Sequence, residues 1–137
     1  RIEFISSFFA AGEIDEVWIT FPDPQLKKSR VKKRLTAPEF LTMYARFLSP
    51  GAVLHLKTDS RHLHEYTKAV IAENSLPVDV ANDDIYGTGY ADEILSVKTA
   101  YEQKFLKEGL PITYLRFGLG GRNEFTAPEF GQDDEIA

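Results

Sequence analysis

Short apolar runs alternate with segments of helical periodicity along the chain, and this alternation restricts its fold more than any other feature. Residues 17–21 and 52–59 are rich in β-branched, aromatic and aliphatic side chains and are predicted to form buried strands. Apolar side chains recur at the spacing of an amphipathic helix in residues 40–48 and 63–71. Strands that alternate with helices indicate an α/β fold with a mostly parallel sheet.

Capping residues predict where the helices begin and end. Thr36 and Glu39 match a capping box, which predicts a helix that ends at the Ser-Pro-Gly of residues 49–51. Ser60 is predicted to cap a second helix that runs to about Asn74.

The last part of the chain predicts two more strands and a third helix. A strand is expected at residues 76–80, and a capping box at residues 99–102 opens a helix that Gly109 ends. The final strand, residues 112–117, is predicted to run antiparallel at the edge of the sheet. Residues 118–137 are Gly-rich and then acidic, and we expect a loose tail there.

Composition excludes several classes of protein. The 137 residues are 43% hydrophobic and 27% charged, values typical of one globular domain and not of a disordered chain. The absence of cysteine excludes a disulfide scaffold and a thiolate zinc site. No apolar run reaches the roughly 18 residues that a membrane span needs. Because the three histidines also lack metal-ligand spacing, we expect neither membrane nor metal as a partner.

Basic residues are concentrated in one short segment of a chain whose net charge is −5. Six of the 16 basic residues lie in residues 27–34, namely Lys27, Lys28, Arg30, Lys32, Lys33 and Arg34. Clustered charge is usually a solvated surface loop. This segment, however, follows a strand end directly, where lysine and arginine could contact the phosphates of a nucleic acid.

Two acidic residues follow the predicted strands at the edge where α/β sheets bind ligands. Asp23 lies between Pro22 and Pro24, just after the first strand, and Asp59 ends the second strand. Each has a structural alternative, since Pro-Asp-Pro is ordinary turn chemistry and Asp59 could cap the following helix. A dinucleotide fingerprint is absent, because residues 118–123 (Gly-Leu-Gly-Gly-Arg-Asn) lack the third glycine and precede no predicted helix.

Four ordered motifs resemble one enzyme family. Residues 21–24 (Phe-Pro-Asp-Pro) with the basic segment resemble the F-P-D-P-W…K-R-R signature of bacterial tRNA (guanine-N7-)-methyltransferases. Residues 36–41, 55–59 and 99–102 resemble that family's T-x-P-E-F-L, H-x-x-T-D and T-x-(F/Y)-E motifs, in the same order. The sequence departs from the pattern at Gln25, where the family has tryptophan.

The resemblance implies the C-terminal part of a Rossmann-like class I methyltransferase fold. Residues 1–119 would be that part and residues 120–137 an acidic, flexible tail, while the half with the glycine-rich cofactor loop would be absent. The implied reaction, in the cytoplasm, transfers a methyl group from S-adenosylmethionine to N7 of the guanosine at position 46 in the tRNA variable loop. We expect this fragment alone to be inactive.

The resemblance also implies roles for individual residues. Asp23 would be the catalytic acid and would contact the cofactor. The tRNA guanosine would be contacted by Lys27, Asp59, Thr99, Ala100, Tyr101 and Glu102. The phosphate contacts would be Lys28, Arg30, Lys32, Lys33 and Arg34. Two alternatives stay open: a methyltransferase of the same fold with another acceptor, and a non-catalytic RNA-binding fragment.

Overall fold

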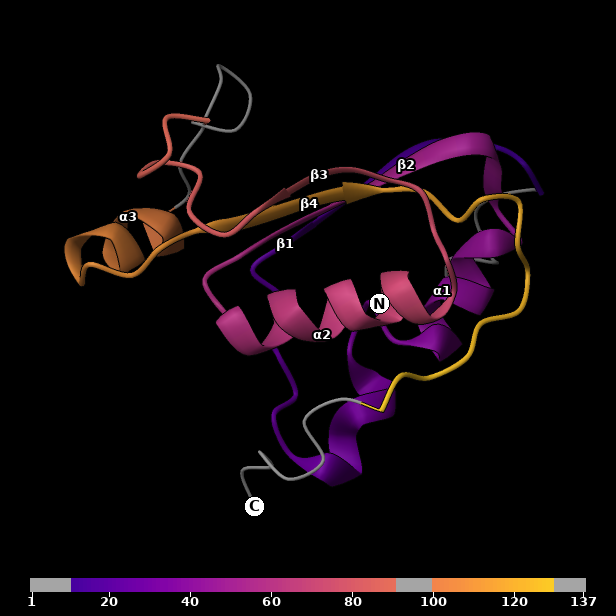
Figure 1. The fold of residues 1–137 in the computed structure, drawn as a ribbon, viewed down its shortest axis with the longest axis horizontal. Coiled ribbons are helices and arrows are strands. Elements are labelled where there is room, and N and C mark those ends of the chain that lie inside the picture. Colours follow the sequence, from indigo (N-terminus) through magenta and orange to yellow (C-terminus); the bar gives the residue numbers. More distant parts are fainter. Residues whose placement is uncertain (1–10, 91–99, 130–137) are drawn as a thin grey trace.

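The computed structural model describes residues 11–90 and 100–129. Helices and strands alternate through most of the chain, as the sequence predicts (Figure 1). Their order is β1 (Ile14–Thr20), the 3₁₀ helix η2 (Lys28–Lys33), α1 (Pro38–Ala45), β2 (Leu48–Thr58), α2 (Arg61–Glu73), β3 (Val78–Asn82), α3 (Ala100–Lys107) and β4 (Thr113–Phe117). Within these ranges, no helix is long and apolar enough to cross a membrane.

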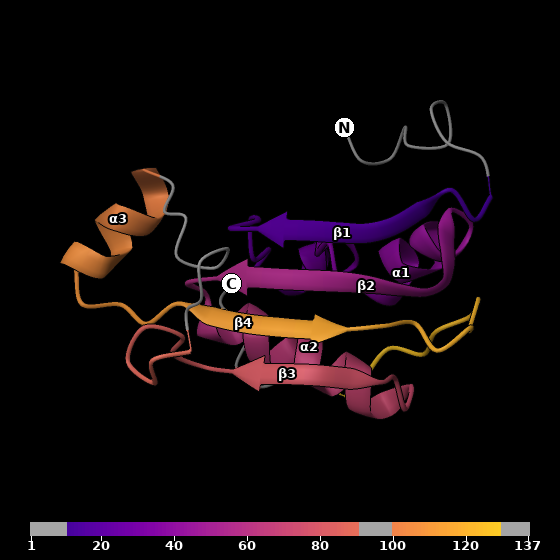
Figure 2. The ribbon, with the colours of Figure 1, turned by 90° about the horizontal axis from the view of Figure 1, so that it is seen from above.

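The four strands form one mixed sheet in the order β1-β2-β4-β3. β1 pairs in parallel with β2, whereas β4 is antiparallel to both of its neighbours. Three strands therefore run in one direction and β4 in the other, as Figure 2 shows. The predicted mostly parallel sheet is not observed among the described strands, since one of their three pairings is parallel and two are antiparallel. The predicted antiparallel edge strand was wrong in its position, because β4 lies inside this sheet and β3 lies at its edge.

Helices α1 and α2 cover one face of the sheet, and the main core lies between them and the strands (Figure 1). The inward-facing side chains of the strands alternate, since successive residues of a strand point to opposite faces. The fully buried members of this core that the strands contribute are Leu54, Leu56, Leu115 and Phe117. Helix α2 contributes Leu63, Tyr66, Val70 and Ile71.

Ser60 is the N-cap of α2, as predicted, and its hydroxyl accepts the amide of Leu63 at 3.1 Å. The prediction of a capping box at the start of α1 was wrong. Ala37 is the N-cap there, without a side-chain bond, and the buried Thr36 hydroxyl instead shares a 2.7 Å hydrogen bond with Thr67 of α2. The Thr36 hydroxyl therefore bonds to helix α2 and not to the first turn of α1.

The Ser-Pro-Gly of residues 49–51 belongs to β2 and does not end the preceding helix, which stops at Ala45. The strand begins at Leu48, and its pairing with β1 shifts register between Ile14 and Glu16. Gly51 has a φ of 83°, a conformation that glycine adopts without strain. The first residues of β2, which follow α1, are therefore irregular in their pairing with β1.

Part of the predicted tail contacts the core. Phe125 packs against the main cluster, and the side chain of Asn74 at the end of α2 makes two hydrogen bonds to the backbone of Thr126. Residues 130–137, the acidic end of the predicted tail, lie outside the described residues.

Candidate functional site

The carboxyl ends of β1 and β2 meet at one edge of the sheet, because these strands are parallel neighbours. Asp23 follows β1 and Asp59 follows β2, so both predicted acids lie at this edge. The amide of Phe21 donates to the carbonyl of Lys57 at 2.8 Å, which ties the exit of β1 to β2. The sequence therefore predicted correctly that both acids follow strands at the same edge of the sheet.

Asp23 is exposed and is held in a rigid turn. Its Oδ1 accepts the amide of Gln25 at 2.8 Å, the local bond that a turn aspartate makes. Phe21 and Gln25 both have a φ of 49°, in the left-handed region that side chains other than glycine rarely adopt. Backbone strain on both sides of an exposed carboxylate is characteristic of a functional site. The hydrogen bond from the Gln25 amide, however, is also what an aspartate with only a structural role in the turn would make.

Asp59 is half-buried, and Ser60, not Asp59, caps the following helix. The amide of Ser60 donates to the hydroxyl of Thr58 at 3.1 Å, and Thr113 donates its hydroxyl to the carbonyl of Thr58 at 2.8 Å. These bonds fix the end of β2 without using the Asp59 carboxylate.

Glu102 on α3 is fully buried. Its Oε1 accepts from Nζ of Lys57 at 2.9 Å, and its Oε2 accepts a short hydrogen bond from the hydroxyl of Tyr86. Burial and this bond to the carboxylate raise the pKa of Tyr86. In this arrangement Glu102 contacts protein groups and is not open to a guanosine.

The rest of the T-A-Y-E motif is described only in part. Ala100 and Tyr101 lie in the first turn of α3, while Thr99 lies outside the described residues. Helix α3 is located beyond the carboxyl ends of β1 and β2 (Figure 2). Lys57 and Tyr86 were not predicted for this site. The one signal for Lys57 was a lone lysine within an apolar strand run, since lysine is almost never fully buried unless it is paired.

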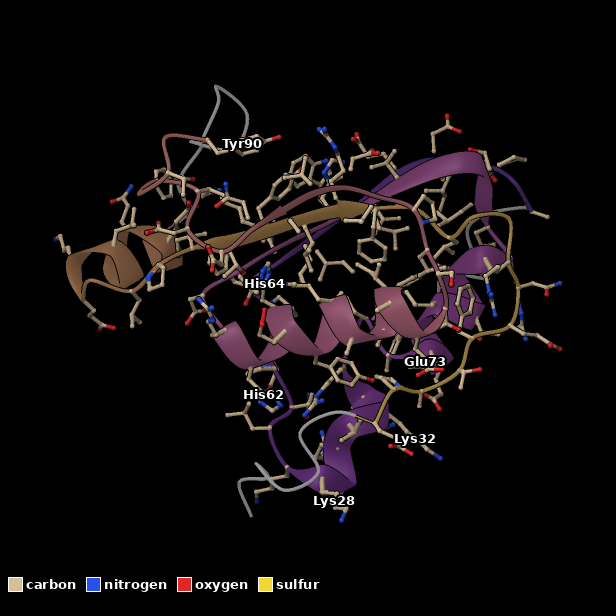
Figure 3. The ribbon with its side chains drawn as sticks, in the orientation of Figure 1. Lys28, Lys32, His62, His64, Glu73 and Tyr90 are labelled. Atoms are coloured by element: carbon tan, nitrogen blue, oxygen red, sulfur yellow. The ribbon has the colours of Figure 1, made fainter. Side chains whose placement is uncertain are left out.

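The basic segment forms an exposed surface. Lys27 precedes η2, and the segment exposes the side chains of Lys28, Arg30, Lys32 and Lys33. Figure 3 shows Lys28 and Lys32 pointing away from the body of the molecule. Arg34 differs from the others: it is only 3% exposed and its guanidinium contacts protein groups, so we remove it from the predicted phosphate contacts.

The comparison with known proteins gives the family. A family model described as "Putative methyltransferase" matches residues 1–115. The chain belongs to this methyltransferase family. It is 53% identical over 120 residues to a tRNA (guanine-N(7)-)-methyltransferase of Porphyromonas gingivalis, covering 87% of this chain and 48% of that protein.

Two further methyltransferases of the same name are similar. The protein of Bacteroides thetaiotaomicron is 47% identical over 129 residues, which is 94% of this chain and 50% of the relative. That of Listeria welshimeri is 37% identical over 110 residues, which is 80% of this chain and 50% of the relative. The chain thus spans about half the length of the curated relatives it matches.

The three histidines of this methyltransferase chain have separate environments. His55 is buried, stacks on Trp18 with ring centroids 3.7 Å apart, and bonds to Glu16 and Tyr114 at 2.6 and 2.7 Å. His62 and His64 lie on opposite sides of α2 (Figure 3). Within residues 11–90 and 100–129, no group of three or more histidine or acidic side chains could hold a metal ion.

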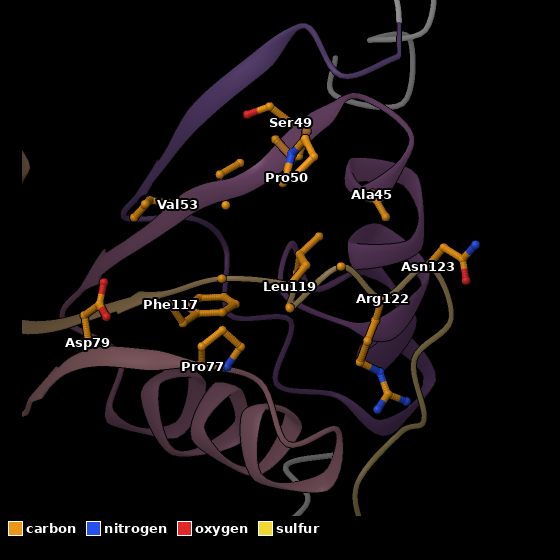
Figure 4. Close-up of a pocket in the computed structure, with 16 residues that line it drawn as sticks. Ala45, Ser49, Pro50, Val53, Pro77, Asp79, Phe117, Leu119, Arg122 and Asn123 are labelled. Atoms are coloured by element: carbon orange, nitrogen blue, oxygen red, sulfur yellow. The ribbon is translucent and has the colours of Figure 1, made fainter.

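One hollow among the described residues has a volume of about 570 Å³ and lies away from Asp23 (Figure 4). Its walls come from the start of β2, the residues before β3 and the Gly-rich residues 118–123. Arg122 lines it but donates to the carbonyl of Asn74 at 3.1 Å. Because it lies at the opposite end of β2 from Asp59, we do not assign the reaction to it.

Proposed function

We propose that the full-length protein containing this chain transfers a methyl group to N7 of a guanosine in tRNA. The observation that carries the proposal is the placement of an exposed carboxylate, Asp23, at the end of β1, immediately followed by an exposed basic segment. The names of the relatives, which match most of this chain, support the same reaction.

The proposed reaction needs a fixed carboxylate but no general base. Guanine N7 has an in-plane lone pair and no proton, so nothing must be removed to create the nucleophile. Methylation leaves the ring positively charged. A fixed carboxylate near the base stabilises that charge as it develops, and Asp23 is exposed on a turn whose backbone is already fixed.

The residues present fit one side of an S-adenosylmethionine site. Asp23 is exposed at the carboxyl edge, and Phe21 and Pro22 beside it are half-buried apolar groups. When bound, S-adenosylmethionine supplies the sulfonium methyl group. Because the sequence has no glycine-rich loop between a strand and a helix, we propose that the other half of the domain holds the rest of the cofactor.

The proposed fold is the C-terminal half of a Rossmann-like class I methyltransferase domain. The parallel pair β1 and β2 with α1 and α2 on one face supports this assignment. Residues 1–119 would belong to the domain, and we propose that further strands of the domain continue the sheet from β1, one of the two edge strands of the described sheet.

The proposed partner is a tRNA in the cytoplasm. Lys27, Lys28, Arg30, Lys32 and Lys33 would contact its phosphates or the target nucleotide. Asp59, with the backbone of Ala100 and Tyr101 near the same edge, remains in the proposed guanosine site. For Glu102 we propose an indirect role, because Lys57 and Tyr86 already bind its carboxylate.

The test is methyl transfer from S-adenosylmethionine to unmodified tRNA by the full-length protein, with the modified base located by cleavage specific for 7-methylguanosine. We expect one modified guanosine in the variable loop. Methylation of an adenosine would show another acceptor. Salt-sensitive tRNA binding without any methylation would show a non-catalytic RNA-binding protein.

A further inference from the structure

Arg34 contacts four groups in two different parts of the fold. Its Nε donates to the carbonyls of Pro24 and Gln25 at 3.1 and 3.2 Å. Its second terminal nitrogen lies 3.2 Å from Nε2 of His62, and its guanidinium carbon lies 4.4 Å above the ring of Tyr66. Arg34 thus joins the turn that carries Asp23 to helix α2.

These contacts suit arginine and no other residue. The Nε–H of a planar guanidinium can be shared between two carbonyls while a terminal nitrogen bonds to an imidazole and the plane stacks on an aromatic ring. Burial lowers the pKa of Arg34, and the bonds to carbonyl oxygens offset the loss of water around the charge. A lysine ammonium has the charge but not this shape.

The turn between residues 21 and 25 is fixed at both of its ends. At the start, the amide of Phe21 donates to β2, and at the end Arg34 binds the carbonyls of Pro24 and Gln25. Both end residues, Phe21 and Gln25, have left-handed backbone angles. Such a conformation persists only where the surrounding contacts hold it in place.

We propose that Arg34 is a positioning residue for Asp23: it holds the turn of residues 22–25 against α2, so that the carboxylate keeps one orientation at the edge of the sheet. This inference rests on the proposed role of Asp23 in methyl transfer. It gives the last residue of the basic segment a task different from that of Lys32 and Lys33, which are exposed.

The decisive variant is Arg34→Lys in the full-length protein, with Lys33→Gln as the control from the same segment. A phosphate contact would be retained by lysine, whereas the turn would lose its planar partner. We expect Arg34→Lys to lower kcat at least about 10-fold, with KM for tRNA and the salt dependence of tRNA binding unchanged. Lys33→Gln should make the salt slope shallower by about one, the effect of one lost phosphate contact.

A second measurement keeps the inference testable if methyl transfer itself is not found. Hydrogen exchange of the Gln25 amide reports on the turn, because this amide donates to Asp23. We expect exchange at least about 10-fold faster in Arg34→Lys than in the parent, and unchanged exchange in Lys33→Gln.

If Arg34→Lys is too unstable to purify, His62→Gln removes one of the groups that hold the guanidinium and should accelerate the same exchange. Parental exchange at Gln25 in a folded Arg34→Lys variant would overturn the inference. A lowered kcat with a raised KM and a shallower salt slope would also overturn it and return Arg34 to the phosphate contacts.

Discussion

Nζ of Lys57 on β2 lies 2.9 Å from Oε1 of Glu102 on α3, and the two side chains are only 5% and 1% exposed. The pair joins residues 45 positions apart and brings α3 to the carboxyl edge of the sheet. Because Tyr86 binds the other carboxylate oxygen, the loop after β3 is tied to the same point. This arrangement makes Glu102 a structural partner within the candidate site.

Removing one member of this pair should be strongly destabilising, because it leaves a buried charge without a partner. We expect Lys57→Met to lower the free energy of unfolding by about 3–5 kcal/mol, measured by urea denaturation of the full-length protein. Adding Glu102→Gln to this variant should restore part of the loss, since no unpaired charge then remains. As a control, Arg61→Ala breaks the exposed 3.3 Å pair with Asp83 and should cost less than about 1 kcal/mol. Equal effects of the two single variants would contradict the prediction.

The exposed lysines of the basic segment should control the salt dependence of tRNA binding. Replacing Lys28, Lys32 and Lys33 by glutamine should make the slope of log affinity against log salt shallower by up to about 3, near one for each lost phosphate contact. The control replaces three exposed basic residues elsewhere, Arg46, Lys68 and Lys107, with the same change in net charge. If both triple variants shift the slope equally, the effect is one of total charge and the segment is only a solvated surface.

Stability should fall in mild acid because His64 is buried as a neutral imidazole. Burial lowers the pKa of His64 from 6.5 to about 4, and its Nδ1 has no hydrogen-bond partner among the described residues. Between these two values the unfolded chain binds a proton that the folded chain does not, so stability decreases as the pH falls from 6.5 to 4. We expect a loss of about 1–3 kcal/mol from this residue, measured by urea unfolding at a series of pH values.

The variant His64→Gln separates this contribution from the other titrating groups. His55, whose pKa is also lowered by burial, remains in the variant and continues to weaken the fold in acid. The stability difference between pH 7 and pH 4.5 should therefore become smaller in His64→Gln without vanishing. An unchanged difference would mean that the pKa of His64 is the same in the folded and the unfolded protein.

Local patterns predicted the elements of the fold well, because their causes lie within a few residues. The β-branched neighbours of Trp18 predicted the strand correctly but not its exposure, since Ile19 is the one buried residue of β1. Ser60 caps α2 by accepting a hydrogen bond from the amide three residues later. The place of β4 inside the sheet could not be predicted, since hydrophobic periodicity carries no information about strand order.

The sequence predicted the position of those candidate site residues that directly follow strands. Asp23 and Asp59 lie where the rule for α/β sheets puts them. The sequence could not show the protein partners of Arg34 and Glu102, because these come from distant segments: His62 and Tyr66 for the first, Lys57 and Tyr86 for the second. In the sequence alone a buried arginine at the end of a basic run looks like its exposed neighbours.

Asp23 is the residue at which the structural and the catalytic interpretations lead to opposite results. Asp23→Asn keeps an oxygen that can accept the amide of Gln25, so the turn should form and the melting temperature should stay near that of the parent. The variant removes the negative charge that the cationic methylguanine would face. Loss of one such fixed electrostatic contact slows enzymes by roughly 10²–10³. We therefore expect methyl transfer to tRNA at least about 100-fold slower in the full-length variant.

Asp59→Asn is the matched variant for this measurement, since it changes the same group at the end of the neighbouring strand. If Asp59 binds the guanosine equally in the ground state and the transition state, its loss should raise KM and leave kcat near the parental value. A well-folded Asp23→Asn enzyme with parental turnover would exclude a catalytic role for Asp23. Its role would then be the structural one in the turn, where it accepts a hydrogen bond from the amide of Gln25.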